Sequence, residues 1–337
     1  MRRGSIDSSR NSHCRLASID RPNESELVGI FKRKSPEAKI NDSDLTFFTG
    51  SKANGLRAIA PEVFAEMGLK VHVHAGHAVD DSGREFGFWN VAAACNEQPQ
   101  SNWRDVIRDH LQRVLASFEA PDPFDVMTPS EVLKRTFARL YDEASIPGIE
   151  SYPHREIAPG IVQMLALDLP ETVAVFNHDN AKKFGGWEAL GRQGLENLRG
   201  LEAEQLEILP APGGGTFNAL LGESVYTASR ALLLPSLAAE LTGQRVQEQF
   251  GWLKSIPNRH QVAWHIIEDT TVINAVNGMA RFTALGYADA AGSVSPHVFW
   301  WNGTSYEQLT HFREDGSLSV HVSPAFQAVL ESVTADS

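Results

Sequence analysis

Residues 297–322 read HVFWWNGTSYEQLTHFREDGSLSVHV. Segments rich in apolar and aromatic residues are separated in this stretch by the dipeptides Asn302-Gly303 and Asp315-Gly316. Both dipeptides suit the type I′ turns that close short β-hairpins. The stretch therefore predicts an antiparallel β-meander, and we expect the chain to finish in strands.

A hairpin followed by a helix is also predicted in the first third of the chain. Residues 69–77, LKVHVHAGH, alternate between apolar and polar side chains, and Asp81-Ser82-Gly83 then turns the chain into a second strand at 84–95. Apolar residues recur at helical spacing over 103–118, which predicts an amphipathic helix against the hairpin. A short helix from Pro61, ended at Gly68, is expected before the hairpin.

A second unit repeats this order. Two strands at 161–169 and 172–176 precede a helix in which Trp187 aligns with Trp103, an indication of internal duplication. A capping box at 128–131, TPSE, opens a bridging helix that we expect to run through Tyr141. Two hairpin-plus-helix units predict an α+β fold with largely antiparallel sheets and helices packed on one face.

Further helices are expected between the second unit and the meander. One runs from near Ser224 to near Gly243. After a strand at 261–267, another helix is capped by Asp269 or Thr270, and we expect it to end at Gly286.

The chain has 337 residues, 42% of them hydrophobic, a length that favours two folded units. Residues 1–44 are rich in Ser, Asn, Arg and Lys, and such a composition buries too little apolar surface to offset the entropy of ordering. We predict a disordered basic tail at 1–44, an N-terminal α+β unit with its bridging helix at 45–145, and a C-terminal α+β domain at 150–330.

The net charge bounds the classes of partner. Acidic residues outnumber basic ones by 42 to 30, which gives a charge of -12. A nucleic-acid-binding surface would be a local exception to this negative field, so we expect no nucleic-acid partner. No apolar run approaches the roughly 20 residues that cross a bilayer, so we expect no membrane span.

Cysteine usage favours the cytoplasm. Cys14 and Cys95 are the only two cysteines, too few for a disulfide framework or a zinc site of four thiolates. The first residues also lack the apolar segment of a secretory signal. We therefore expect a cytoplasmic protein.

His72 and His74 are the candidate metal ligands. Residues two apart on a strand point to the same side, so both imidazoles could reach one ion, with His77 nearby. Lys70 lies on the same face, and no carboxylate follows His74 at the next position of that face. The pattern therefore favours a solvated hairpin face and no metal, with His72 and His74 as the ligands if a metal binds.

No cofactor is expected. Gly213-Gly214-Gly215 lacks the Lys-Ser/Thr pair of a phosphate-binding loop and the spacing of a dinucleotide fingerprint, which favours a flexible turn. Ser224 stands outside any Gly-x-Ser-x-Gly elbow, and helix capping explains it. Asn177-His178-Asp179 lies where a strand passes into a helix and is interpreted as a helix cap.

Two segments are candidates for ligand or partner contacts. Pro257-Asn258-Arg259-His260 precedes a strand, and its polar groups either order a tight turn or contact a ligand. Trp300 and Trp301 are neighbours on a strand, so their side chains face opposite sides of the sheet. One of them therefore either contacts a partner or is covered by a second layer, and Trp301 is the candidate for a partner contact.

Four segments of the second half resemble the bacterial YtpQ-type family, to which no reaction is assigned. The resemblance covers roughly residues 160–310, about half of the chain, and implies a fold rather than a chemistry. Arg230, Asn258 and Arg259 are carried over as polar positions within matching segments, without a catalytic role. The segments are LDLPETVAVFNHDNAKKFGGWEALGRQGLENL (167–198), YTASRALLLP (226–235), IPNRHQVAWHIIED (256–269) and SPHVFWWNGTSYEQL (295–309).

These observations favour a non-enzymatic protein-binding or adaptor module whose partner is a protein; the sequence indicates no oligomeric state. The alternative is a hydrolase, with or without a metal, whose site combines His72, His74, His178 and carboxylates from distant parts of the chain. A third hypothesis is a small-ligand sensor in which Gly213 to Gly215 and Arg230 form one anion pocket.

Overall fold

The computed structural model describes residues 42, 45, 48–119, 121–170, 172–202, 205–246, 249–289, 292–313 and 316–335. The expected α+β class is confirmed, because helices accompany sheets whose pairs are all antiparallel within the described residues. Apart from Asp42, the predicted tail at 1–44 lies outside the residues described.

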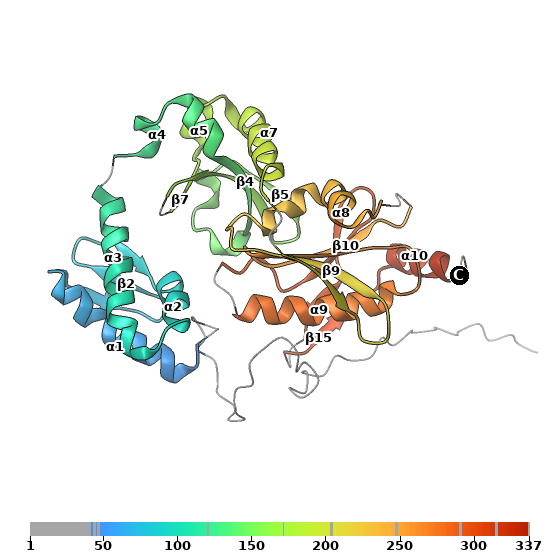
Figure 1. Cartoon of the computed structure of the whole chain (residues 1–337), viewed down its shortest axis with the longest axis horizontal. Helices are drawn as coiled ribbons and strands as arrows, with labels where there is room; N and C mark the ends of the chain where they lie inside the picture. The colour runs from blue at the N-terminus through green and yellow to red at the C-terminus, as the bar shows by residue number, and fades with distance from the viewer. Residues whose placement is uncertain are drawn as a thin grey trace, which may run out of the picture.

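The N-terminal unit packs two long helices and a short one around a three-stranded sheet (Figure 1). Its core includes Phe48 and Trp103, whose rings stack with centroids 5.4 Å apart. Its elements are α1 (Gly50–Glu66), β1 (Val71–Val73), β2 (His77–Asp80), β3 (Glu85–Gly87), α2 (Trp89–Asn96), η1 (Gln100–Asn102) and α3 (Trp103–Glu119).

Two expectations for this unit are corrected. The first helix begins at Gly50, because Thr49 caps it by accepting a hydrogen bond from the Lys52 amide, and Pro61 lies inside the helix rather than at its start. Residues 89–96 form α2 instead of continuing a strand. The run from Val91 to Cys95 is apolar in either conformation, and its alanines favour a helix.

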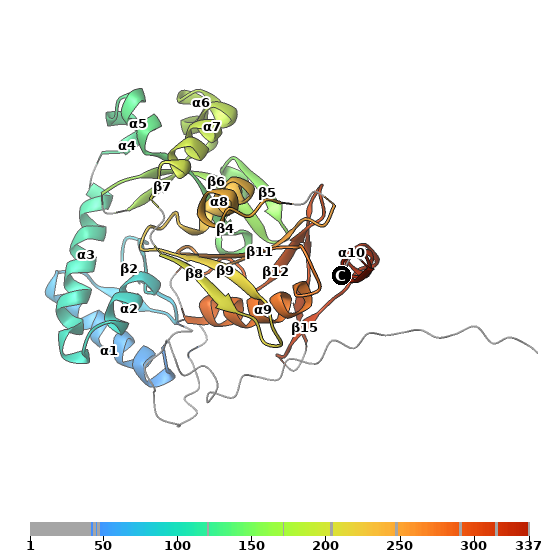
Figure 2. The same cartoon turned by 45° about the vertical axis from the view of Figure 1, so that its right-hand side comes forward.

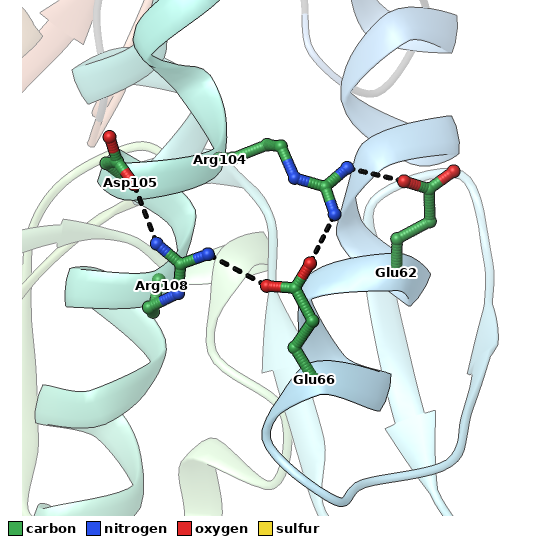
Figure 3. Close-up of polar contacts among 5 residues, drawn as sticks. All are labelled: Glu62, Glu66, Arg104, Asp105 and Arg108. Carbon is green, nitrogen blue, oxygen red and sulfur yellow. Dashed lines mark hydrogen bonds and ion pairs between the residues drawn. The ribbon is translucent and has the colours of Figure 1, made fainter.

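Ion pairs join α1 to α3 on the surface of this unit (Figure 3). Arg104 pairs with Glu62 and Glu66, and Arg108 pairs with Glu66 and Asp105. All five side chains are at least one-third exposed, so water and salt screen their charges. The ion pairs therefore contribute little to the stability of the fold and mainly orient α1 against α3.

The second unit is a four-stranded sheet with helices against it. The capping box at Thr128 is confirmed, but its helix ends at Arg135, and Thr136–Asp142 is a strand that pairs with β6 along its whole length. The elements are α4 (Pro123–Val126), α5 (Pro129–Arg135), β4 (Thr136–Asp142), η2 (Glu143–Ser145), η3 (Ile149–Ser151), β5 (His154–Ala158), β6 (Ile161–Asp168), β7 (Val173–Val175), α6 (His178–Lys183) and α7 (Gly186–Arg199).

The third unit is a six-stranded sheet of order β13-β12-β10-β11-β9-β8, followed by the small β14-β15 hairpin. The meander is confirmed, but α10 follows it, and α9 continues past Gly286 to Asp289. Elements are β8 (Gln205–Pro210), β9 (Thr216–Leu221), η4 (Ala228–Leu233), α8 (Leu234–Thr242), β10 (Trp252–Asn258), β11 (Gln261–Ile266), α9 (Val272–Asp289), β12 (Val298–Trp301), β13 (Tyr306–Gln308), β14 (Thr310–Phe312), β15 (Leu318–Val320) and α10 (Pro324–Ala335).

Both faces of the six-stranded sheet are covered (Figures 1 and 2). One face carries Trp252, Trp264 and Phe299 against η4, α8 and residues of the four-stranded sheet. The other face packs against α9 and α10. The η4 segment therefore lies between the two sheets, and the candidate site is built around it.

Candidate functional site

Polar side chains from both sheets meet where β4 approaches the turn between β10 and β11. We call the group formed by Arg139, Tyr141, Arg259 and His260 the arginine site. Arg139 and Tyr141 come from β4, and Arg259 and His260 form the turn. The two pairs are about 120 residues apart in the chain, so only the tertiary fold brings them together.

The alternation of β4 aims its polar residues into this site. Phe137, Arg139 and Tyr141 are two residues apart and share one face of the strand. Phe137 stacks on Tyr226, with ring centroids 4.2 Å apart. The Arg139 guanidinium lies 4.8 Å from the ring centroid of Tyr141 and 5.8 Å from that of Tyr226, so aromatic faces hold the cation without a carboxylate.

Asn258 fixes the turn. It is fully buried; its Nδ2 donates to the Gly286 carbonyl at 2.8 Å, and its Oδ1 accepts from the His260 amide at 2.9 Å. The backbone of Arg259 is also held at both ends, since its N–H donates to the Gly292 carbonyl and its C=O accepts from the Ala228 amide. The turn is therefore a rigid support for the side chains of Arg259 and His260.

His260 is held as a neutral imidazole. Arg259 Nε donates to His260 Nε2 at 2.9 Å, so Nε2 accepts, and the proton resides on Nδ1, which donates to the Gly222 carbonyl at 3.1 Å. Burial lowers the pKa of His260, and the Arg259 charge lowers it further. Both ring nitrogens are thus engaged within the protein.

The site is positively charged. Burial lowers the pKa of Arg259, and the charge of Arg139 lowers it further, so the two guanidinium groups repel each other. Neither arginine forms an ion pair with another described residue. Asp168, which contacts Tyr226 beside the site, is already engaged, because its Oδ1 accepts a hydrogen bond from the Tyr226 hydroxyl at 3.0 Å.

Two donors in the site are unused. Arg139 Nε and Tyr141 Oη are buried, and neither donates a hydrogen bond to a described residue. Burial raises the pKa of Tyr141, against the opposing effects of the Arg139 charge and of a side-chain hydrogen bond from Arg139, so its hydroxyl keeps its proton. A buried donor without an acceptor costs about 1–3 kcal/mol, and an anionic group bound here would supply the acceptor.

The other predicted contact residues lie in different surroundings. Arg230 is buried in η4 and lines a cavity that is separate from the arginine site. Asn258 stabilises the turn, and its buried side chain uses both Nδ2 and Oδ1 in hydrogen bonds within the protein. Trp301 is half-buried, and its ring stacks on that of Trp252 with centroids 5.4 Å apart. Trp300 is buried against Phe326, so α10 covers Trp300 as a second layer.

The predicted histidines do not form a common site. His72 on β1 and His74, the residue after that strand, are both exposed, and the His74 ring stacks on that of His77 with centroids 4.7 Å apart. His178 opens α6, far from this hairpin in Figure 2, and its Nε2 contacts the Glu150 carbonyl at 3.0 Å. Among the residues described, no three His, Cys, Asp or Glu side chains are placed to hold a metal ion.

Gly213 to Gly215 precede β9 and are not among the residues that line the cavity beside Arg230, so the two do not form one pocket. All three glycines have positive φ, and the space beside Gly213 and Gly215 is filled by Asn274 and Thr271 of the α9 region. The glycines therefore allow a tight turn to pack against α9, as the turn interpretation predicted.

Arg139, Tyr141 and Tyr226 were not predicted as site residues. The spacing of Phe137, Leu140 and Tyr141 also fits a helix, and for this reason the sequence pattern predicts a helix where strand β4 lies. The period-two alternation of Phe137, Arg139 and Tyr141 with Ala138 and Leu140 is the signal that identifies it.

Comparisons with known proteins add no relative. Neither the models of protein families, nor the curated proteins, nor the solved structures contain a match to the chain. Among the helices that the structure describes, none combines the length and apolar character needed to cross a membrane.

Proposed function

We propose that this chain is a non-enzymatic protein-binding module whose arginine site holds an acidic group of the partner. The observation that carries the proposal is the pair of buried, unused donors, Arg139 Nε and Tyr141 Oη, beside a second guanidinium. An arginine fork matches the geometry of a carboxylate, and a low local dielectric strengthens the contact.

Binding explains the site better than proton-transfer chemistry does. A general base needs a free nitrogen or oxygen, but both nitrogens of His260 are engaged by Arg259 and by the Gly222 carbonyl. The Tyr226 hydroxyl is likewise committed to Asp168. The groups left over are hydrogen-bond donors and cations, which recognise an anion.

The charge of the whole chain makes the site selective. At a net charge of -12 the protein repels acidic partners at long range, so attraction must come from the local geometry of Arg139 and Arg259. Both side chains are half-buried, which leaves them open to solvent on one side. An acidic side chain on a protruding segment of a partner fits such a site.

We also propose that the chain is related to the YtpQ-type family. The four segments that carry the resemblance supply Asp168, Tyr226, Arg230, Arg259 and His260. Under this relation the turn that carries Arg259 and His260 would be shared with the family, whereas Arg139 and Tyr141 lie outside the four segments.

The test uses the full chain immobilised and two pools of short random peptides, one with glutamate and one with glutamine fixed at the centre. We expect the glutamate pool to be retained in preference, and the double variant Arg139→Gln/Arg259→Gln to lose that preference by about tenfold or more. Equal retention of both pools, or a double variant that retains glutamate peptides as the wild type does, contradicts the proposal.

Two further variants separate binding from folding. Tyr141→Phe removes a buried hydroxyl whose proton has no acceptor among the described residues, so the free protein should be about as stable as the wild type while retention of the glutamate pool weakens. Arg199→Gln is the matched control, because Arg199 is an exposed arginine of α7 that pairs with Glu196, and it should leave retention unchanged.

A further inference from the structure

A third arginine, Arg230, is buried within the η4 segment. Arg230 is only 3% exposed, and its Nε and Nη1 make no hydrogen bond among the described residues. It forms no ion pair within that part of the chain either. Burial lowers the pKa of Arg230, and the charge of Glu240 opposes that shift in part. Glu240 accepts no hydrogen bond from Nε or Nη1, so an anion bound beside Arg230 would supply the missing acceptor.

The guanidinium borders a cavity of about 160 Å³. The cavity lies between the end of α7, strand β9 and the segment Ser224–Arg230. Its wall combines the apolar side chains of Leu201 and Leu220 with the polar residues Glu202, Ser224, Thr227 and Arg230. Apolar walls with a few convergent polar groups are typical of small-molecule sites.

We propose that this cavity is a binding site for a small anion of the phosphate or carboxylate class, held by Arg230. Its volume equals roughly five water molecules at about 30 Å³ each, and sites for drug-sized ligands measure about 300–1,000 Å³. The ligand is therefore inorganic phosphate or a short carboxylic acid, and not a nucleotide or a peptide.

The cavity is distinct from the arginine site. Tyr226 points toward Arg139 and Asp168, whereas the next residues of the same segment, Thr227 and Arg230, line the cavity. The segment between them therefore separates two cationic sites, and each can be removed without the other.

Among the described residues that line the cavity, Glu202 alone carries a carboxylate, and its side chain is exposed. Its negative charge opposes an incoming anion. Glu202→Gln should therefore tighten anion binding several-fold, and because the side chain is exposed this variant should fold normally.

The experiment measures inorganic phosphate and acetate binding to the full chain by calorimetry and by thermal shift. We expect saturable binding by the wild type, a loss of about tenfold or more in Arg230→Met, and tighter binding in Glu202→Gln. Arg230→Met should also be no less stable than the wild type without added anion, because methionine removes a buried charge whose Nε and Nη1 have no hydrogen-bond acceptor among the described residues.

Several outcomes overturn the proposal. If neither phosphate nor acetate raises the melting temperature of the wild type at concentrations up to about 20 mM, the cavity is not an anion site. Equal stabilisation of wild type and Arg230→Met would reveal non-specific salt effects. Binding that survives in Arg230→Met but disappears in Arg139→Gln/Arg259→Gln would place the anion in the arginine site, which contradicts this inference and supports the proposed function.

Discussion

The Lys254 ammonium lies 3.3 Å from the ring centroid of Tyr306, inside the covered face of the six-stranded sheet. Lys254 is fully buried on β10, with Trp264 and Phe299 as its cross-strand neighbours, and its Nζ makes no hydrogen bond among the described residues. The ring face of Tyr306 compensates only part of the lost hydration. Burial therefore lowers the pKa of Lys254 to about 7.

Replacing Lys254 by methionine should stabilise the protein by about 1–4 kcal/mol near pH 7, because methionine fills a similar volume without a charge. The pH dependence should change as well. The unfolded state holds the Lys254 proton up to about pH 10.5 and the folded state only up to about 7, so stability of the wild type should rise with pH in this window, by up to about 1.4 kcal/mol per pH unit. Urea unfolding from pH 6 to 10 measures both effects.

The control for this prediction is Lys182→Met, at an exposed lysine of α6. It should leave the pH profile unchanged. A Lys254→Met protein that is less stable than the wild type at every pH would show that the Lys254–Tyr306 contact is net favourable.

His297 should make the fold sensitive to acid. Burial lowers its pKa to about 4, with a further contribution from His311, whose ring centroid is 6.2 Å away. The unfolded state binds a proton below about pH 6.5 and the folded state only below about 4, so stability should fall as the pH drops through this window, by up to about 3 kcal/mol. His297→Gln should flatten that decline in urea titrations, whereas His154→Gln, at an exposed histidine, should not.

Local signals in the sequence predict much of the fold. Thr128 and Glu131 form the expected capping box, and the Asn302-Gly303 turn closes the hairpin of β12 and β13. These features depend on residues a few positions apart, and their physical chemistry is the same in a peptide and in the folded protein. Strand β10 is different: WLKSIPN contains a lysine and a proline, and all seven residues are buried, so it has no alternation to detect.

The candidate site shows the same division. Arg259 was a candidate because the polar turn Pro257 to His260 is visible locally. Arg139 gives no local sign of function, since its importance depends on lying beside a turn about 120 residues away. The lack of a partner for Arg139 Nε is a property of the tertiary structure alone.

Asn258→Ala should lower the free energy of unfolding by roughly 2–4 kcal/mol. The substitution leaves the buried Gly286 carbonyl and the His260 amide without the partners that Asn258 provides, and each unsatisfied group costs about 1–3 kcal/mol. Asn258→Asp keeps an acceptor for the His260 amide but removes the donor to Gly286. Chemical denaturation should therefore place the stability of Asn258→Asp between that of the wild type and that of Asn258→Ala.

Gly194 provides a test of how α7 supports the arginine site. A Cβ at this position would lie 2.5 Å from the Ala138 amide nitrogen and 2.9 Å from the Phe137 carbonyl carbon, so the helix packs directly on the backbone of β4. Gly194→Ala should push α7 away from β4, lower stability by about 1–3 kcal/mol, and weaken retention of glutamate peptides because Arg139 is on the displaced strand.

Gly191→Ala is the matched control on the same helix. No atom lies within 4 Å of the Cβ that alanine would add, and alanine favours the helix by up to about 1 kcal/mol. This variant should therefore be as stable as the wild type or more stable, and it should retain the peptides fully. If Gly194→Ala is destabilised but retains the peptides fully, the position of β4 does not determine binding and the arginine site is misassigned.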